Sequence, residues 1–431
     1  MEELRFMKIL VVGRGAREHA ISWKIHQSKL VDSIYCATGN SGMEEIAELV
    51  NIKAENIQEL LKFVKKNKID ITIVGPEVAY YQGIVELFQK EGLKVFGPSK
   101  KAFDLEISKA FTKELLCKYN IPTASFGVFS DQDKAFEYLE QNSPPYVIKA
   151  DGIDAGKGLL IAKDEITARL SVNVILKDHI FGEAGKNIII EELVAGTPVS
   201  IVAFTDGNKI LGSTSVVNYQ RVYDGDRGPF SGGMGSYSPD PKVDDKLLEE
   251  INRDFLVPTI NAMKTEGRIL KGILYMNLIH TDKGLKVVDF QTRFNDPATQ
   301  TILPRMKTDL VQIMDAIITE KTENIEIEWD DKYCVSIVMV SGGYPMKYSI
   351  NKKITGVDSI KTDKNLQVFH ARISKAGDNL VTVGGRVLNV VAKGKTLEEA
   401  RKKAYKNIEN IFFTEAHYRK DIAKLEKSEG E

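Results

Sequence analysis

Short apolar runs alternate with amphipathic stretches over the first hundred residues of the chain. Between two of these runs, residues 57–64 carry apolar side chains at the i, i+3, i+4 and i+7 spacing of a helix that buries one face. Strands that alternate with helices form parallel sheets, so the pattern predicts a doubly wound α/β sheet within residues 1–104. The predicted strands are residues 8–12, 33–36, 71–74 and 93–96, each followed closely by a glycine.

The pattern changes in the middle of the chain. Residues 146–150 and 159–162 are strand-like runs joined by a loop, 151–158, whose glycines and lysine predict a mobile flap between two strands. A further strand is predicted at 187–194. Glycine, proline, serine and aspartate dominate residues 219–241, which predicts a long irregular loop, and loops of that length within a domain are usually functional.

The last hundred residues mix short strands with one helix. Thr396 and Glu399 match a capping box, and Leu397, Ala400 and Ala404 then fall on one helical face. The pattern predicts a mixed region of strands and one helix over these residues, and a small α+β domain at 331–431 is what the resemblance described below implies. The chain is therefore expected to be multidomain, with α/β and α+β parts.

Charge and composition exclude several classes of partner. The 431 residues carry 59 basic and 60 acidic side chains, so no field of one sign is available to hold nucleic acid or an anionic membrane. No apolar run is long enough to span a bilayer, and residues 1–6 lack the apolar core of a signal peptide. The three cysteines lie far apart and suit a reducing compartment. We expect a cytoplasmic protein with neither nucleic acid nor membrane as partner.

A glycine turn follows the first predicted strand. Residues 13–19 read Gly-Arg-Gly-Ala-Arg-Glu-His, in which backbone amides at a helix N-terminus can hold a phosphate. A dinucleotide site is disfavoured, because Glu18 stands where the fingerprint requires glycine and no acid ends the second strand. We predict a monophosphate site with Arg17 as a charged donor. The alternative is a tight turn that binds nothing.

A second candidate site is the glycine-rich loop at 151–158 together with Lys149. Glycines allow close approach of the backbone and lysines neutralise phosphate charge, so the loop is suited to a nucleotide triphosphate. It is not a Walker loop, since no Gly-Lys-Ser/Thr opens a helix. The alternative is a solvated, lysine-containing hairpin.

A third candidate site is the run Asp-Phe-Gln-Thr-Arg-Phe-Asn-Asp-Pro at 289–297. Alternation along a strand is expected to place Asp289, Gln291 and Arg293 on one face. Two oxygen-bearing side chains beside an arginine are what Mg²⁺ and a transferring phosphoryl group require. The alternative is a surface strand with an ordinary ion pair.

Taken in order, these motifs resemble the phosphoribosylamine–glycine ligases, a family of ATP-grasp enzymes, from Met7 to about Ala404. The similarity rests on their number and order along the chain. It is carried by Gly13 to His19, Gly39-Asn40, Val74 to Glu77, Phe96 to Ser99, Ser108 to Phe111, Ile121 to Thr123, Lys149 to Gly158, Glu191-Glu192, Asp224 to Asp226, Gly228-Pro229, Gly232 to Gly235, Arg293-Phe294, Asp296-Pro297, Gln300, Leu303 to Arg305, Gly342 to Pro345 and Gly384 to Leu388.

The resemblance implies a substrate domain at 1–104, an ATP-grasp pair at 105–330 with a mobile lid at about 123–192, and the C-terminal domain at 331–431. It implies amide formation between glycine and 5-phosphoribosylamine through a glycyl phosphate, with ATP as co-substrate and Mg²⁺ or Mn²⁺ as cofactor, in a monomer or small homo-oligomer. The implied ATP-binding residues are Lys109, Lys149, Gly152, Gly156, Lys157, Gly158, Glu191, Glu192, Leu193 and Val194. The implied substrate-binding residues are Gly13, Gly15, Arg17, Glu18, Gly75, Pro76, Glu77, Asp226, Gly232, Gly233 and Met234. Arg293 and Asp296 are the implied catalytic residues, and Asp289 and Gln291 the implied metal ligands.

The sequence departs from the family pattern at three places. Asp289 and Gln291 replace the usual Glu and Asn, Asn295 and Ala298 flank Asp-Pro where Gly and Glu are usual, and Thr197-Pro198 replace two glutamates. A related ligase with a different amino-acid or amine substrate is the main alternative function. A catalytically silent relative that binds nucleotide is the other.

Overall fold

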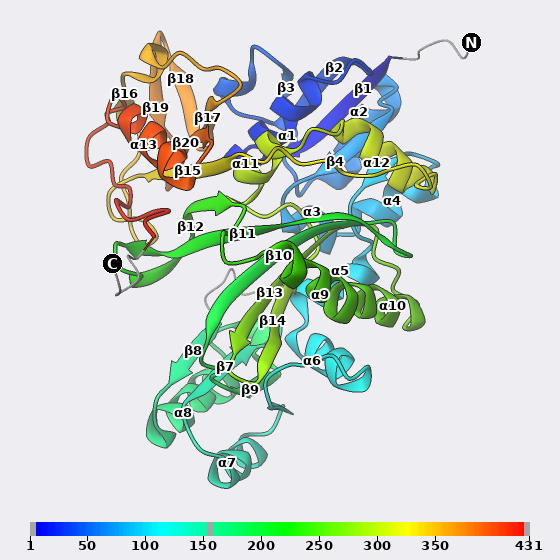
Figure 1. Ribbon diagram of the computed structural model, residues 1–431, viewed down its shortest axis with the longest axis vertical. Coiled ribbons are helices and arrows are strands. Elements are labelled where there is room, and N and C mark those ends of the chain that lie inside the picture. Colours follow the sequence, from blue (N-terminus) through cyan, green and yellow to red (C-terminus); the bar gives the residue numbers. More distant parts are fainter. Residues whose placement is uncertain (1–5, 153–157, 426–431) are drawn as a thin grey trace.

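The computed structural model describes residues 6–152 and 158–425, and its first unit is a parallel five-stranded sheet. The strand order is β3-β2-β1-β4-β5. From β1 the chain first adds β2 and β3 on one side and then β4 and β5 on the other. Helices lie on both faces of the sheet, as a doubly wound arrangement requires (Figure 1). The predicted parallel sheet is confirmed. The elements are β1 (Met7–Gly13), α1 (Ala16–His26), β2 (Val31–Thr38), β3 (Glu48–Val50), α2 (Ile57–Asn67), β4 (Ile71–Val74), α3 (Glu77–Tyr81), α4 (Ile84–Lys90) and β5 (Val95–Phe96).

Apolar spacing explains why these segments pack as they do. The helix predicted over 57–64 is α2, which buries Leu60, Leu61 and Val64 against the sheet and begins at Asn56, whose side chain accepts a hydrogen bond from the Glu59 amide. All four residues of β4 are buried, as expected of a strand covered on both faces. The core of this unit therefore follows from the sequence pattern.

An antiparallel sheet of eight strands forms the centre of the molecule and continues into its C-terminal part. Its order is β14-β13-β10-β11-β12-β15-β20-β17, and helices α5, α6, α9 and α10 cover the β10–β13–β14 end (Figure 1). The strands are β10 (Thr197–Thr205), β11 (Ile210–Tyr223), β12 (Arg227–Ser238), β13 (Gly272–Thr281), β14 (Gly284–Gln291), β15 (Tyr333–Val340), β17 (Leu366–His370) and β20 (Arg386–Gly394). The helices are α5 (Lys100–Ile107), α6 (Lys109–Lys118), α9 (Asp245–Ile251) and α10 (Val257–Thr265).

The prediction of a long irregular loop at 219–241 is wrong, because most of this segment belongs to the hairpin of β11 and β12. The pairs run from Val217 with Tyr237 to Tyr223 with Arg227, and the register shifts twice between them. Backbone pairing to β15 on the other side of β12 fixes the segment as strand despite its glycines and prolines. Gly228 and Gly233 have positive φ, and they absorb the irregular register that alternation alone does not anticipate.

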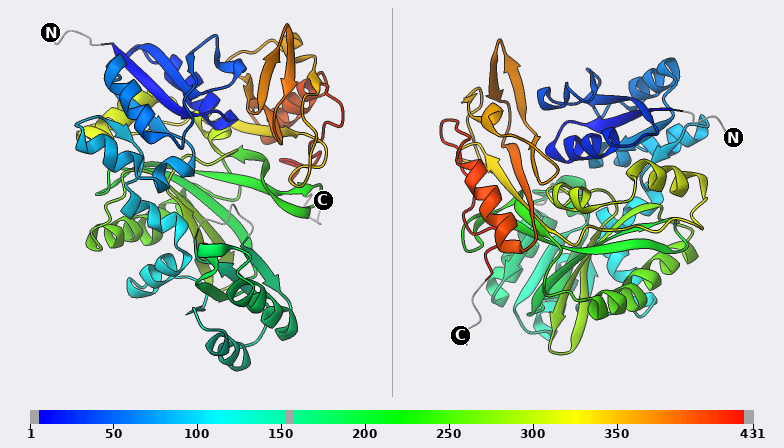
Figure 2. Two further views of the ribbon diagram at one scale, coloured as in Figure 1. Left: turned by 180° about the vertical axis from the view of Figure 1, so that it is seen from behind. Right: turned by 45° about the horizontal axis from the view of Figure 1, so that its top comes forward.

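A smaller sheet, β6-β9-β7-β8, lies at the opposite end of the molecule from the N-terminal sheet (Figures 1 and 2). The strands flanking the predicted flap are confirmed as an antiparallel pair, in which Lys149 lies opposite Leu159. The loop between them includes 153–157, outside the described residues. The elements are β6 (Phe126–Phe129), α7 (Gln132–Gln141), β7 (Tyr146–Ala150), β8 (Leu159–Ala162), α8 (Glu165–Val172) and β9 (Ile188–Glu192).

The C-terminal part adds a three-stranded sheet and one helix. Helix α13 (Leu397–Ile408) packs on β15 and β20 and begins with the predicted cap, since Thr396 Oγ1 accepts from the Glu399 amide at 3.1 Å. Strands β16 (Lys353–Ile354), β19 (Asn379–Thr382) and β18 (Ile373–Ala376) form the small sheet. The multidomain fold class is confirmed. Within residues 6–152 and 158–425, no helix is both long and apolar enough to cross a bilayer.

We expect the Phe290→Ala variant to lose about 3–5 kcal/mol of unfolding free energy, the usual cost of deleting a fully buried aromatic ring. Phe290 lies on β14, and its side chain is fully buried against the helices that cover this strand. The matched control is Phe412→Ala, because that ring is 66% exposed and its removal should change stability by less than about 0.5 kcal/mol. Urea denaturation followed by circular dichroism measures both. Equal losses in the two variants would contradict the packing described.

Candidate active site

The turn between β1 and α1 encloses the carboxylate of Glu18. The Gly15 amide donates to Glu18 Oε2 at 2.6 Å, and Arg17 Nε donates to Oε1 at 2.6 Å. Gly75 approaches from the end of β4, and a Cβ there would lie 1.9 Å from Glu18 Oε1, so only glycine fits. The anion position predicted in this turn is thus filled by the protein's own carboxylate, and the charge of Arg17 is compensated within the fold.

A second group of cations lies beside this turn, and the sequence analysis did not include it. Asn40 donates to the backbone oxygens of Arg14 and His370, both at 2.9 Å, and so joins the N-terminal sheet to β17. Burial, followed by the nearby charge of Arg372, lowers the pKa of Arg14. Arg14 Nε and Ser41 Oγ are buried without hydrogen-bond partners among the described residues. These two arginines and the unpaired donors of Arg14 and Ser41 favour an anion.

Arg293 is fixed by two carboxylates. Its guanidinium lies 2.9 Å from Glu106 Oε1 and 3.5 Å from Glu77 Oε2. Burial alone would raise the pKa of Glu77, but Arg293 and Arg17 outweigh burial and lower it. The two carboxylates therefore hold the guanidinium in one orientation.

The expectation that Arg293 alternates on the strand with Asp289 and Gln291 is wrong. Strand β14 ends at Gln291, because the next amide, that of Thr292, donates to Glu106 Oε2 at 2.8 Å instead of to a neighbouring strand. Arg293 is therefore placed by Glu106 and not by the pleat.

Asp289 and Gln291 do lie on one face of β14, opposite the buried ring of Phe290. Asn277 on β13 faces Asp289 and donates to its Oδ1, while Ser200 Oγ donates to Asn277 Oδ1 at 2.7 Å. Gln291 Oε1 is buried and has no hydrogen-bond partner among the described residues. Two oxygen-bearing side chains on one strand face, one of them with an unpaired oxygen, fit a Mg²⁺ ion that completes its shell with substrate and water. Nowhere in the described part of the chain do three His, Cys, Asp or Glu side chains gather as a metal site.

Three buried charges meet where β7, β9 and α6 come together. Glu191 Oε1 lies 2.7 Å from Lys149 Nζ, and Glu191 Oε2 lies 2.8 Å from Lys113 Nζ. Burial lowers the pKa of Lys113, although Glu191 partly opposes the shift. The sequence analysis did not identify Lys113 as a site residue, because it belongs to no recognisable motif. One carboxylate shared by two lysines leaves one positive charge over, which suits a phosphate.

The other predicted ATP-binding residues flank this triad. Lys109 Nζ donates to the Glu106 carbonyl at 2.9 Å, which connects the triad's helix with the Arg293 pair. Glu192 pairs with Lys286 at 2.6 Å, and the Leu193 amide donates to the Pro145 carbonyl at 3.0 Å. Gly152 has positive φ next to Ala184. Val194 and Gly158 border the same strands, whereas Gly156 and Lys157 lie outside the described residues.

Asp296 belongs to a further cluster, which links the segment between β14 and α11 to β20. Arg386 Nη2 lies 3.1 Å from Asp296 Oδ2, and Gln300 Nε2 donates to Asp296 Oδ1 at 2.7 Å. Gly232 contributes its carbonyl to Arg386, and Gly233 packs on Pro297. In the sequence, Gln300 and Arg386 stand only among the residues that carry the family resemblance, and their contacts with Asp296 emerge from the structure.

Two predicted substrate-binding residues lie apart from these clusters. Asp226 is at the tip of the β11–β12 hairpin and pairs with Arg419 at 2.6 Å. The side chain of Met234 is fully buried in a small apolar cluster with Val222 and Val338. Pro76 presents no polar side chain and precedes α3 as its N-cap residue. The structure thus brings together most, but not all, of the predicted site.

Comparison with known families covers almost the whole chain. Residues 7–106 match the phosphoribosylglycinamide synthetase N domain, residues 107–299 its ATP-grasp (A) domain and residues 334–425 its C domain. The phosphoribosylamine–glycine ligase of Caldanaerobacter subterraneus is 46% identical over 97% of this chain and 99% of its own. That of Escherichia coli is 41% identical over 96% and 98%.

Solved structures agree with this comparison. The crystal structure of phosphoribosylamine–glycine ligase from Thermotoga maritima superposes with a TM-score of 0.84 and 29% identity, covering 96% of this chain and all of that one. The biotin carboxylase domain of 2-oxoglutarate carboxylase from Hydrogenobacter thermophilus reaches a TM-score of 0.73 at 15% identity, over 96% and 92%. The latter similarity shows the fold alone.

We expect Glu18→Gln to destabilise the protein by about 3 kcal/mol, because it leaves Arg17 buried beside a neutral amide. Glu91→Gln is the matched control, since Glu91 forms an equally short pair with Lys65 on the surface and its loss should barely change the denaturation midpoint. Urea denaturation of the two variants compares them directly. A Glu18 variant as stable as the Glu91 variant would show that the turn does not depend on this carboxylate.

Proposed function

The chain belongs to the phosphoribosylglycinamide synthetase family, and from this premise we propose that it joins glycine to 5-phosphoribosylamine with hydrolysis of ATP to ADP and phosphate. It is an ATP-dependent ligase of purine biosynthesis. The observation that carries the substrate assignment is the match of all three family domains, in order, together with relatives of the same name that align over their full length. The product is glycinamide ribonucleotide.

We divide the chain into a substrate domain at 1–104, an ATP-grasp part at 105–330 with a lid at about 123–192, and a C-terminal domain at 331–431. This division is supported by the parallel sheet, the separate four-stranded sheet and the C-terminal strands. We further propose a cytoplasmic enzyme that acts as a monomer or small homo-oligomer on small molecules.

ATP is proposed to bind between the four-stranded sheet and the β13–β14 end of the central sheet. Lys149 and Lys109 would hold its phosphates, with Lys113 keeping Glu191, and through it Lys149, in place. The loop at 151–158, with Gly152, Gly156, Lys157 and Gly158, would cover the phosphates, and residues 191–194 would border the base. Exclusion of water by such a loop protects a reactive acyl phosphate.

A divalent ion, Mg²⁺ or Mn²⁺, would be held by Asp289 and Gln291 and would neutralise charge on the transferring phosphoryl group. This assignment is supported by the unpaired, buried Gln291 oxygen and by the fixed orientation of Asp289. Asn277 is proposed as a positioning residue, because its amide holds the shorter Asp side chain in one orientation.

The reaction is proposed to proceed in two steps. The glycine carboxylate attacks the γ-phosphorus and ADP leaves; the amine of phosphoribosylamine then attacks the glycyl carbonyl and phosphate leaves. Arg293, oriented by Glu106 and Glu77, would stabilise the charge that develops on the acyl phosphate. Asp296, held by Arg386 and Gln300, would accept a hydrogen bond from the attacking amine.

The sugar phosphate is proposed to lie between the N-terminal sheet and β17. The Glu18 carboxylate occupies the turn, so we assign the phosphate to Arg14 and Arg372 and leave Glu18 with Gly13, Gly15, Arg17, Gly75 and Glu77 to shape the sugar subsite. The unpaired Arg14 Nε and Ser41 Oγ support this assignment. Gly232 and Gly233 would border the same space.

ADP formation should depend on both co-substrates, because attack requires a carboxylate positioned at the γ-phosphate. A coupled assay with phosphoribosylamine generated in place measures ADP release with ATP and Mg²⁺ alone, and then with glycine, alanine or serine added. We expect rapid turnover with glycine only. Faster turnover with alanine or serine would favour a ligase of different specificity, and ATP binding without any turnover would favour a silent relative.

Asp289→Asn should reduce turnover about 100-fold or more, the scale of losing one electrostatic contact to the transition state. Raised Mg²⁺ or substituted Mn²⁺ should restore part of the activity. Electron paramagnetic resonance with ATP present measures Mn²⁺ binding directly and does not depend on turnover. Asp289→Asn should lower the Mn²⁺ affinity, and Asn277→Ala should lower it as well.

The matched control for the metal assignment is Asp282→Asn in the exposed turn between β13 and β14. Unchanged Mn²⁺ affinity in the Asp289 variant would remove Asp289 from the metal site.

A further inference from the structure

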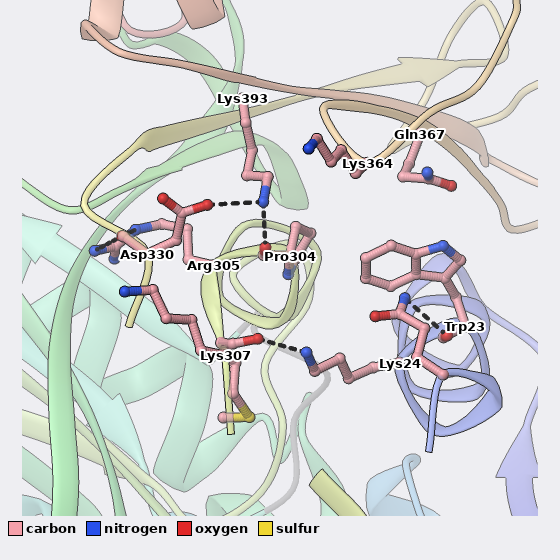
Figure 3. A pocket seen from close by; sticks show the side chains of 11 residues that line it. Trp23, Lys24, Pro304, Arg305, Lys307, Asp330, Lys364, Gln367 and Lys393 are labelled. Atoms are coloured by element: carbon pink, nitrogen blue, oxygen red, sulfur yellow. Dashed lines mark hydrogen bonds and ion pairs between the residues drawn. The ribbon is translucent and has the colours of Figure 1, made fainter. Parts of the chain in front are cut away.

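A basic cavity of about 360 Å³ lies where the three parts of the molecule meet, and the proposed reaction does not use it (Figure 3). Helix α1 contributes Trp23 and Lys24, the segment after α11 (Thr299–Ile302) contributes Arg305 and Lys307, and the C-terminal part contributes Lys364 and Lys393. Asp330 is the single acidic residue of the lining. Five cationic side chains thus face one carboxylate.

The carboxylate compensates only one of these cations. Asp330 Oδ2 accepts from Lys393 Nζ at 3.0 Å. Over residues 6–152 and 158–425, no carboxylate lies within ion-pair distance of Lys24, Arg305, Lys307 or Lys364, and only the charges of Asp309 near Lys24 and of Asp330 and Asp331 near Arg305 act on them from further away. The lining is therefore strongly cationic.

The buried cations are held by neutral oxygens. Arg305 donates to the backbone oxygens of Asp330 and Lys332 and to the hydroxyls of Thr214 and Ser238. Lys24 donates to the Met306 carbonyl. These contacts orient the cations without neutralising them, and each ammonium group has three donors, so capacity for a further acceptor remains.

Burial makes this charge excess costly when nothing is bound. Burial lowers the pKa of Arg305, and it lowers the pKa of Lys24 against the opposing charge of Asp309, with Lys393 adding to the shift. A bound anion would relieve this cost, because a charge-assisted hydrogen bond to a desolvated cation is stronger than one to a solvated cation.

The cavity is separate from the proposed reaction site. Along α1, Lys24 follows Arg17 by about 10 Å at the helical rise per residue. Along β20, Lys393 follows Arg386 by about 23 Å at the strand rise per residue. Each element has one end in the reaction site and the other in the cavity.

We propose that this cavity binds a small polyanion of the pyrophosphate class, either inorganic or as part of a nucleotide whose base would lie against the Trp23 indole. Its volume fits a ligand of that size. A pyrophosphate group carries several negative charges over a short distance, which matches a lining with four cations that form no ion pair among the described residues better than a single carboxylate does. The inference does not depend on the reaction proposed above.

The experiment is calorimetric titration of the whole protein with inorganic pyrophosphate. Lys307→Ala/Lys364→Ala is the test variant, since both side chains are exposed and the fold does not rest on them. Its affinity should fall about tenfold or more, the scale of two lost charge-assisted contacts. Lys353→Ala/Lys402→Ala, which removes two exposed lysines outside the cavity, is the matched control and should bind as the unaltered protein does.

Thermal unfolding gives an independent readout, because a ligand that binds the folded state alone raises the unfolding midpoint. Pyrophosphate should raise it in the unaltered protein and in the control variant, but much less in the test variant. Equal binding and equal midpoint shifts in all three proteins, or no binding at millimolar pyrophosphate, would overturn the proposal.

Titration with ADP then distinguishes the two sources of the polyanion. Two ADP sites in the unaltered protein and one in the test variant would identify a nucleotide. One ADP site in both the unaltered protein and the test variant, with pyrophosphate binding lost in the variant, would identify the inorganic ion.

Discussion

The ion pair between Arg293 and Glu106 is the contact on which the rest of the site depends. Arg293 follows strand β14 and Glu106 lies near the end of α5, so the pair forms only when that helix is docked on the central sheet. The same carboxylate accepts the Thr292 amide and thereby ends β14, and the Glu106 carbonyl accepts Lys109. Without Glu106, Arg293 would keep only the longer contact with Glu77, 3.5 Å, in a largely buried position, and loss of a close partner from such a cation is destabilising. Folding and assembly of the reactive groups are therefore one event.

The same constraint recurs at the other clusters. Glu18 pairs with Arg17, and Glu191 pairs with both Lys149 and Lys113, in each case through side chains that are nearly inaccessible to water. The cations of the site are thus oriented before any substrate arrives, and an incoming phosphate or carboxylate meets donors that need little rearrangement. Preorganisation of this kind is the largest contribution to many rate enhancements. It also explains why carboxylates are numerous in a site whose substrates are themselves anions.

Local signals in the sequence were sufficient for much of the fold but not for the contacts within the site. The apolar spacing of α2 and the apolar run of β4 predict the N-terminal sheet, because burial on one face or on both requires apolar residues at a regular spacing or in a continuous run. The β11–β12 hairpin shows no such pattern of apolar residues, since its glycines are accommodated by pairing with strands distant in the sequence. Glu106, Asn277 and Arg386 were missed for a related reason: each acts through a partner far along the chain, and no spacing within one element reports such a pair.

The basic cavity and the reaction site share three structural elements, and this limits how independently they can behave. Helix α1 joins Glu18 to Lys24, the segment through α11 joins Asp296 to Arg305, and β20 joins Arg386 to Lys393. Helices and paired strands transmit displacement along their length because their backbone hydrogen bonds resist stretching, and close-packed interiors do not absorb it. A change in the separation of Lys24 and Lys393 must therefore alter the position of Glu18 relative to Arg386, or else break contacts such as the hydrogen bonds of Asn40 to Arg14 and His370. The N-terminal and C-terminal parts consequently cannot move at the cavity without either moving at the site or breaking these contacts.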